Sequence, residues 1–296
     1  MSAGLSTNGE AARPSDGAAA ADLRQHLVSS RLAGQVATTV ASSLGNCRNL
    51  VAGNPLYTFG LSDWRDATYD EAVAAVGALG GEPAGRPGPN ALDGCAYIDP
   101  DAALAGIRRH HDALHEFVAD GGGRVLIATG HPFALLSHYG ALARTLAAHG
   151  CTLLRPLEGH RHTLRSREGK PASIRYLDGV AALYYDAGLQ HTHLPVYMEA
   201  MLDELGGSDG VDLVVADHGY AGAAIEAGIP TLSIADVNDP ALPLAHARGR
   251  TRGVLLIDDG LDAALFTPIT RAILAWASDG GAEREGFEPS RRVIPT

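Results

Sequence analysis

The stretch Val211-Asp-Leu-Val-Val-Ala-Asp217-His218-Gly219-Tyr-Ala-Gly222 decides the fold. An apolar run of strand length ends in an acid, a histidine and a glycine, and a helical pattern begins directly after them. In an open α/β sheet the carboxyl ends of strands and the amino ends of helices meet at one edge, where ligands bind. The stretch therefore indicates an α/β fold with polar side chains at a ligand-binding edge.

Two other stretches repeat this pattern, namely Arg124-Val-Leu-Ile-Ala-Thr129-Gly130-His131-Pro132 and Thr231-Leu-Ser-Ile-Ala-Asp236-Val-Asn238-Asp239-Pro240. Runs of strand length fall at 124–128, 152–156, 172–177, 180–185, 211–216, 231–235 and 253–257, and helical patterns fall at 133–149, 195–205, 221–227, 241–247 and 268–278. This alternation predicts a Rossmann-like α/β fold with a mostly parallel, doubly wound sheet and one antiparallel hairpin at Asp178-Gly179.

The chain divides into four predicted parts. Residues 1–20 are rich in Ser, Gly, Ala and Pro and are expected to form a disordered leader, and the polar residues 280–296 a disordered tail. Residues 21–120 are expected to form a helical N-terminal cap, and residues 121–279 the Rossmann-like core. The helices of the cap are predicted from apolar spacing at 21–45, 69–79 and 99–118, with a Gly/Pro loop at 80–94.

Composition narrows the class of protein. The 296 residues carry a net charge of −11, which argues against a nucleic-acid-binding surface because such a surface needs a basic stripe. The three cysteines, Cys47, Cys95 and Cys151, form neither a disulfide framework nor a CxxC zinc motif. No signal peptide or transmembrane-length apolar run is visible. The composition favours a cytoplasmic protein without nucleic-acid or membrane partners, and leaves a homo-oligomer open.

The segment Thr129-Gly130-His131-Pro132 is the first candidate for ligand binding. Gly130 permits close approach to the backbone, Pro132 suits the first helical position, and the amino end of a helix attracts an anion. His131 can donate to a phosphate oxygen or bind a metal. The alternative is a structural turn from strand to helix.

Histidines and carboxylates at the strand ends point to a divalent metal. In an extended segment His191 and His193 lie on one face and can meet one ion. Asp217, Asp236 and Asp239 would repel one another without a cation. The alternatives are ordinary loop histidines and, for Asp217 and Asp239, helix N-caps.

Two further segments are weaker candidates. Glu158 sits where the strand at 152–156 ends, and the arginines that follow it can clamp a phosphate or belong to a solvated loop. Asp258-Asp259 closes the strand at 253–257 as either a turn or a contributor to the ligand-binding edge. The sequence contains no GxGxxG, Walker, GxSxG or HExxH motif, which lowers the odds of the mechanisms that use them.

Several of these segments together carry a resemblance to a known family. They are 125–132, His191-Thr-His193 with Met198-Glu-Ala-Met201, Asp212-Leu-Val-Val-Ala-Asp217-His218-Gly219 with Ala221-Gly222, and Ala235-Asp236-Val-Asn238-Asp239-Pro240-Ala241-Leu242. They resemble an actinobacterial family generally labelled simply "phosphatase". The start, His26-Leu-Val with Arg31-Leu-Ala-Gly34 and Val36-Ala-Thr38, is similar as well, so the likeness runs from about 23 to about 274.

The resemblance implies a phosphoester hydrolase that acts on a small phosphorylated metabolite. The positions that match the family are Arg31, Thr129, Gly130, His131, His191, His193, Asp217, His218, Asp236, Asn238 and Asp239. The chain departs from the family after its N-terminal helix. Where members carry an Arg and an Asn pair followed by a Tyr, this chain reads Val40-Ala-Ser42-Ser43-Leu-Gly-Asn46-Cys47, which would change the contacts with substrate.

The leading hypothesis is a metal-assisted phosphatase acting on a sugar phosphate, a nucleoside phosphate or a similar metabolite. Catalytic roles are predicted for His131, Asp217 and His218, substrate contacts for Arg31, Thr129, Gly130, Glu158, His191, Gly219 and Asn238, and metal ligation for His191, His193, Asp217, Asp236 and Asp239. Two rival hypotheses use the same residues. One is an isomerase, lyase or nucleoside-processing enzyme, and the other is a non-catalytic protein that binds a phosphorylated ligand.

Overall fold

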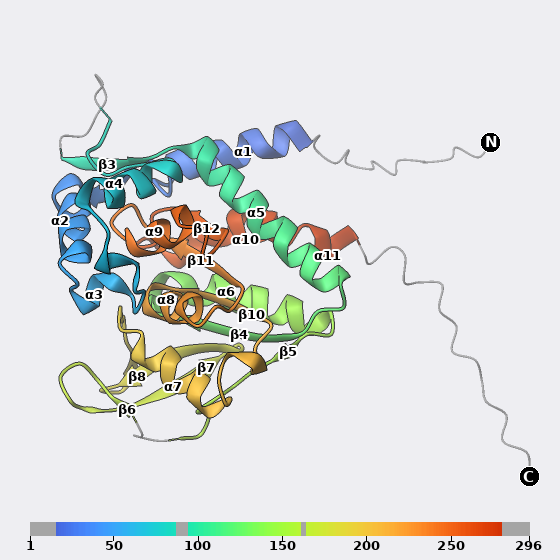
Figure 1. The fold of residues 1–296 in the computed structure, drawn as a ribbon. Coiled ribbons are helices and arrows are strands. Elements are labelled where there is room, and N and C mark those ends of the chain that lie inside the picture. Colours follow the sequence, from blue (N-terminus) through green and yellow to red (C-terminus); the bar gives the residue numbers. More distant parts are fainter. Residues whose placement is uncertain (1–15, 87–93, 161–163, 280–296) are drawn as a thin grey trace, which may run out of the picture.

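The computed structural model describes residues 16–86, 94–160 and 164–279 (Figure 1). The predicted tail at 280–296 and most of the predicted leader lie outside these residues. The first helix already begins at Asp16, so the prediction that residues 16–20 belong to a disordered leader is wrong. None of the helices in the described part of the chain is long and apolar enough to cross a membrane.

A nine-stranded sheet forms the centre of the molecule. Its strands are β4 (Arg124–Thr129), β5 (Thr152–Leu153), β6 (Leu164–Arg165), β7 (Pro171–Leu177), β8 (Val180–Tyr185), β9 (Gly188–Leu189), β10 (Leu213–Asp217), β11 (Thr231–Ala235) and β12 (Gly253–Leu256). They run in the order β12-β11-β10-β4-β8-β7-β6, with β5 paired to β4 and β9 to β8. Pairing is parallel from β12 through β4 to β8 and between β4 and β5, and it is antiparallel between β8 and β7, β7 and β6, and β8 and β9. The predicted mostly parallel α/β sheet is confirmed.

Helices cover both faces of this sheet (Figure 1). The helices are α1 (Asp16–Ser29), α2 (Val40–Val51), α3 (Pro55–Thr58), α4 (Tyr69–Ala78), α5 (Pro100–Ala119), α6 (Pro132–Ala148), α7 (Val196–Glu204), α8 (His218–Glu226), α9 (Ala241–Ala247), α10 (Thr267–Ile273) and α11 (Trp276–Asp279), with short 3-10 turns at Asp63–Arg65, Ser208–Gly210 and Ala263–Phe266. Helices α5, α6 and α10 pack together on one face, and α7, α8 and α9 on the other. The strands β10, β11 and β12 are buried along their whole length, as strands covered on both faces must be.

The predicted hairpin at Asp178-Gly179 joins β7 and β8. The two strands are antiparallel and pair Leu177 with Val180. Both turn residues have positive φ, 50° for Asp178 and 84° for Gly179, as a two-residue hairpin turn of the favoured hand requires.

The N-terminal region is not purely helical, which corrects the prediction for residues 21–120. It contains a three-stranded antiparallel sheet of β1 (Gly34–Thr39), β2 (Gly81–Glu82) and β3 (Cys95–Ile98) in the order β1-β3-β2. The helix expected over 21–45 is broken at Arg31 and Gly34, which have φ of 64° and 79°. Val36 lies in β1 and Val40 already begins α2, so the apolar spacing that predicted one helix runs across a strand and the helix after it.

Two histidines outside the strand-end edge are buried in the core. The Nε2–H of His110 on α5 donates to the carbonyl oxygen of Gly253 at 2.8 Å, and His138 on α6 contacts Thr270 Oγ1 at 2.8 Å through Nδ1. Burial lowers the pKa of His110 to about 4 and that of His138 to about 3. Both side chains are therefore neutral in the folded protein at neutral pH.

These histidines should make stability depend on pH. An unfolded histidine takes up its proton near pH 6.5, so stability is lost as the pH falls from about 6.5 toward 4, by about 1.4 kcal/mol per pH unit for each group. His110→Gln keeps a side-chain donor for Gly253 and should lower the slope of the unfolding free energy by about one proton. Urea unfolding between pH 5 and 7 measures the slope. An equal change in His111→Gln, at the partly exposed neighbour, would contradict this account.

Candidate active site

A cavity of about 360 Å³ lies at the carboxyl edge of the parallel strands. We call it the His/Asp cavity. Its lining comprises Ala37, Thr38, His131, His191, His193, His218, Asp236, Asn238, Asp239, Asp258, Asp259, Gly260 and Leu261. The ends of β4, β10, β11 and β12 supply most of these residues, and β1 of the small N-terminal sheet supplies Ala37 and Thr38.

His218 stands at the junction of β10 and α8, held by Asp217. The φ of His218 is 46°, in the left-handed region that non-glycine residues rarely adopt. Asp217 is fully buried, and its Oδ1 accepts from His218 Nδ1 at 2.7 Å and from the Gly130 amide at 2.8 Å. With Nδ1 engaged, His218 presents Nε2 to the cavity. Asp217 occupies the N-cap position of α8, but its side chain makes no capping bond, so capping does not explain it.

The glycines at these two junctions allow the segment 192–194 to pack against the strand ends. A Cβ on Gly130 would lie 2.4 Å from the Thr192 carbonyl oxygen, and one on Gly219 would lie 2.4 Å from the His193 carbonyl oxygen. The Thr192 amide also donates to the Gly130 carbonyl at 2.9 Å. Both glycines thus admit the protein's own backbone, and this packing carries His191 and His193 over the edge of the sheet.

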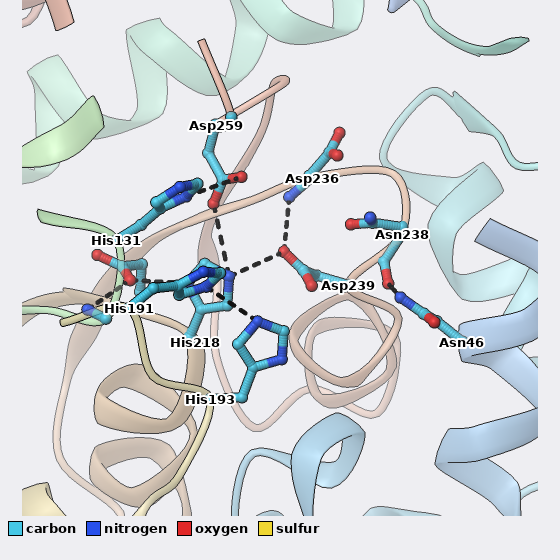
Figure 2. A network of polar contacts seen from close by, with 12 residues as sticks. Asn46, His131, His191, His193, His218, Asp236, Asn238, Asp239 and Asp259 are labelled. Carbon is cyan, nitrogen blue, oxygen red and sulfur yellow. Dashed lines mark hydrogen bonds and ion pairs between the residues drawn. The ribbon is translucent and has the colours of Figure 1, made fainter. Parts of the chain in front are cut away.

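Four histidine rings meet in the cavity (Figure 2). The rings of His131 and His191 stack with centroids 4.5 Å apart, and the Nε2 atoms of His191 and His193 are 3.0 Å apart. His193 Nδ1–H donates to the Leu56 carbonyl at 2.8 Å, so its Nε2 carries a lone pair. The ring of His218 lies 4.6 Å from that of His193.

Buried carboxylates face the histidines (Figure 2). Asp239 Oδ2 lies 3.7 Å and Asp259 Oδ2 lies 3.8 Å from His218 Nε2, and Asp259 Oδ1 lies 3.5 Å from His131 Nδ1. Asp239 also accepts from the Asp236 amide at 3.2 Å. The Thr38 hydroxyl donates to Asp236, which ties the small sheet to the rim of the cavity.

The surroundings split the histidines into two protonation classes. Burial opposes charge on His218, but the carboxylates of Asp239, Asp217 and Asp259 raise its pKa to about 10. Burial likewise opposes charge on His131, and the nearby carboxylate of Asp259 outweighs it and raises the pKa.

The remaining two histidines and the acids Asp236 and Asp239 are shifted toward their neutral forms. Burial and the charge of His218 lower the pKa of His191 to about 4 and that of His193 to about 3. Burial and neighbouring carboxylates raise the pKa of Asp239 to about 6 and that of Asp236 well above its usual range. The pKa of Asp259 is instead lowered by His131 and His218. A bound cation would favour ionisation of Asp236 and Asp239 as well.

The residues present fit a divalent cation. The nitrogens of His131, His191 and His218 lie within 4.8 Å of one another, and so do the ligand atoms of His218, Asp239 and Asp259. Asp259 Oδ2 and His131 Nδ1 are buried without a hydrogen-bond partner in the described structure, which leaves donor atoms available. Imidazole nitrogen with carboxylate oxygen is a ligand set for zinc, manganese or iron.

The structure brings most of the sequence-predicted residues together. Seven line the cavity, namely His131, His191, His193, His218, Asp236, Asn238 and Asp239. Four are buried directly behind it, namely Thr129, Gly130, Asp217 and Gly219. Asp217 therefore orients His218 from behind instead of facing the cavity as the predicted metal ligand would.

Two predicted residues lie apart from the cavity lining. Arg31 donates to the carbonyl oxygens of Gln35 and Val36, within its own turn. Glu158 is exposed and pairs with Arg155 at 2.8 Å. Neither contact points to a ligand, and their predicted substrate contacts stay predictions.

The residues missing from the predicted set are Asp259 and Thr38. Asp259 follows β12 just as Asp217 ends β10, so its position at the end of a parallel strand could have identified it. A turn explained the Asp258-Asp259 pair equally well. Thr38 belongs to the segment 36–38 that shares in the family resemblance, but the helix expected over 21–45 hid the strand that directs it toward the cavity.

The segment that departs from the family pattern lies against the cavity lining. Asn46 Nδ2 on α2 donates to the Asn238 carbonyl at 2.8 Å, and Asn238 Nδ2 donates to Ser42 Oγ at 3.4 Å. Ser42 and Asn46 therefore support Asn238, one of the residues lining the cavity.

Comparison with known proteins shows the family of this chain. The sequence matches the family model described as Phosphatase over residues 18–280. It is 36% identical over 265 residues to Phosphatase SCO2771 of Streptomyces coelicolor, an alignment that covers 87% of this chain and 95% of that protein. On the strength of a match over most of its length, the chain belongs to the Phosphatase family and is a hydrolase.

Proposed function

We propose that the protein is a metal-assisted phosphatase that acts on a small phosphorylated metabolite such as a sugar or nucleoside phosphate. The observation that supports this most directly is the meeting of four histidines with buried carboxylates in one cavity of about 360 Å³. Such a volume admits a phosphate group and part of a small metabolite. The net charge of −11 is no obstacle, because local cationic groups decide phosphate binding.

The geometry favours a ligand set centred on His218. Its Nε2 with Asp239 and Asp259 forms one compact group, and its ring with His131 and His191 forms the other. His191 and His193 are neutral, as a metal-binding histidine must be. A divalent cation bound here would offset the charge of the phosphoryl oxygens and lower the pKa of a water molecule.

The chain's own residues bind and protonate the ester. In the metal-free protein the carboxylates of Asp259, Asp239 and Asp217 hold His131 and His218 in the protonated form. A cation bound at His218 Nε2 would displace the proton there, so His131 is the imidazolium that can donate to phosphoryl oxygens. The Gly130 amide donates to Asp217, so it is not free for the phosphate as the sequence suggested. His131 can pass its proton to the leaving oxygen, which is general acid catalysis.

Metal removal tests this function. Purified protein should release inorganic phosphate from at least one member of a panel of sugar phosphates, nucleotides and p-nitrophenyl phosphate. EDTA should abolish the release, and one of Mg²⁺, Mn²⁺ or Zn²⁺ should restore it. Release that persists after EDTA treatment, with no metal in the protein, would exclude metal assistance. Binding of a phosphorylated compound without any release would instead support the non-catalytic binding protein.

A further inference from the structure

A second cavity adjoins the His/Asp cavity. It has a volume of about 520 Å³ and is lined by His131, Pro132, Phe133, Leu189 and His191. His131 and His191 line both cavities, and their stacked rings form a common boundary. We call this second space the side cavity.

Phe133 is the unusual residue of the side cavity. It is the second residue of α6, and 74% of its surface is exposed. The other exposed large apolar side chains of the described residues, Val28, Leu177 and Val196, are 42–47% exposed and line neither cavity. Single exposed apolar residues are ordinary on a protein surface, but this aromatic ring stands next to two histidines of the candidate active site.

We propose that the side cavity binds the organic group of the substrate, and that this group is uncharged and aromatic or otherwise apolar. The inference rests on the proposed function, because it places the phosphate in the His/Asp cavity. An ester that crosses the His131–His191 boundary would then rest its organic group on Phe133 and Leu189.

The lining determines the chemical class. Among the described residues no carboxylate, lysine or arginine lines the side cavity, and the one cationic side chain there, His131, is assigned to the phosphate by the proposed function. A second charged group on the substrate would therefore have no partner of its own in the side cavity. Phe133 and Leu189 offer aromatic stacking and apolar contact, which favour a planar ring. A third cavity of about 250 Å³ also borders His191 and His193, but Arg167 and Glu168 line it and His131 does not. The side cavity is thus the one that continues from the protonated His131.

Two phosphonates that differ only in their organic group test the proposal. Phenylphosphonate carries a ring and methylphosphonate does not, and neither is hydrolysed by a phosphatase. Isothermal titration in buffer with a divalent cation should show phenylphosphonate binding about tenfold more tightly to the wild-type protein. Phe133→Ala should remove most of this preference and leave the affinity for methylphosphonate unchanged. Phe133→Tyr should keep it.

Leu177→Ala is the matched control, because Leu177 is exposed and apolar and lines neither cavity. Equal binding of the two phosphonates by wild type, no binding of either, or equal loss of preference in Leu177→Ala would overturn the proposal. So would a Phe133→Ala protein that keeps the preference and only changes its oligomeric state. Phosphate release from phenyl phosphate is measured separately. Its absence would count against the proposed function, and an intact preference for phenylphosphonate would still support the side cavity.

Discussion

The variant His218→Asn is expected to lose about 10²- to 10⁴-fold in kcat for p-nitrophenyl phosphate. His218 is the residue shared by both ligand groups of the cavity, and its Nε2 lies within 4 Å of both Asp239 and Asp259. Asparagine is chosen because it tolerates the left-handed backbone of residue 218 better than other non-glycine residues. The folding of the backbone at this junction should therefore survive the change.

Removal of the imidazolium also leaves Asp217 and Asp239 without their cationic partner, so we expect a loss of about 3 kcal/mol in stability. Activity is therefore measured well below the unfolding transition, with the fold checked by circular dichroism. His111→Asn, on α5 and outside the cavity, should match the wild type in both readouts. A folded His218→Asn protein with more than a tenth of wild-type kcat would contradict the role given to His218.

The fold could be predicted from the sequence where a strand is buried on both faces. The strands β4, β10, β11 and β12 are short apolar runs followed by polar residues. A run of that length between two helical patterns predicts a buried strand. The small N-terminal sheet of β1, β2 and β3 could not be predicted. Its strand β1 shows a mixed burial pattern, and its one valine, Val36, falls at a helical spacing between Leu32 and Val40. Strand β2 has only two residues.

The sequence predicts which residues gather at the site, because the carboxyl ends of parallel strands lie at the same edge of a sheet. Asp236 and His131 follow from that rule without any knowledge of packing. The orientation of side chains at the edge does not follow from it. Asp217 and His218 are adjacent in sequence, yet one is fully buried behind the cavity and the other lines it, because the left-handed turn at residue 218 directs them differently. Thr38 reaches Asp236 from 198 residues away in the chain, a contact that no local pattern encodes.

Asp239→Asn is expected to abolish metal binding while it stabilises the metal-free protein. The carboxylate of Asp239 is buried near Asp259, and burial together with the charge of Asp259 outweighs the nearby His218 and raises the pKa of Asp239 to about 6. Because this folded-state pKa lies above the unfolded value of 3.8, ionisation at pH 7 opposes folding when no cation is bound. The amide oxygen of asparagine can still accept from the Asp236 amide, as Asp239 does now.

The two effects separate a ligand from a structural carboxylate. With EDTA present, Asp239→Asn should unfold with a free energy about 2 kcal/mol higher than the wild type at pH 7. With a divalent cation present, the wild type should gain stability and the variant should not, and kcat should fall about 100-fold together with the metal content. Asp112→Asn, at an exposed acid on α5, should change none of these quantities. A variant that keeps its metal, or that is less stable than the wild type without metal, would show that Asp239 holds the fold together instead of a cation. Asp239→Asn should thus stabilise the metal-free protein and remove the stabilisation by metal. This combination is expected for a ligand-binding carboxylate that destabilises the fold when no ligand is bound.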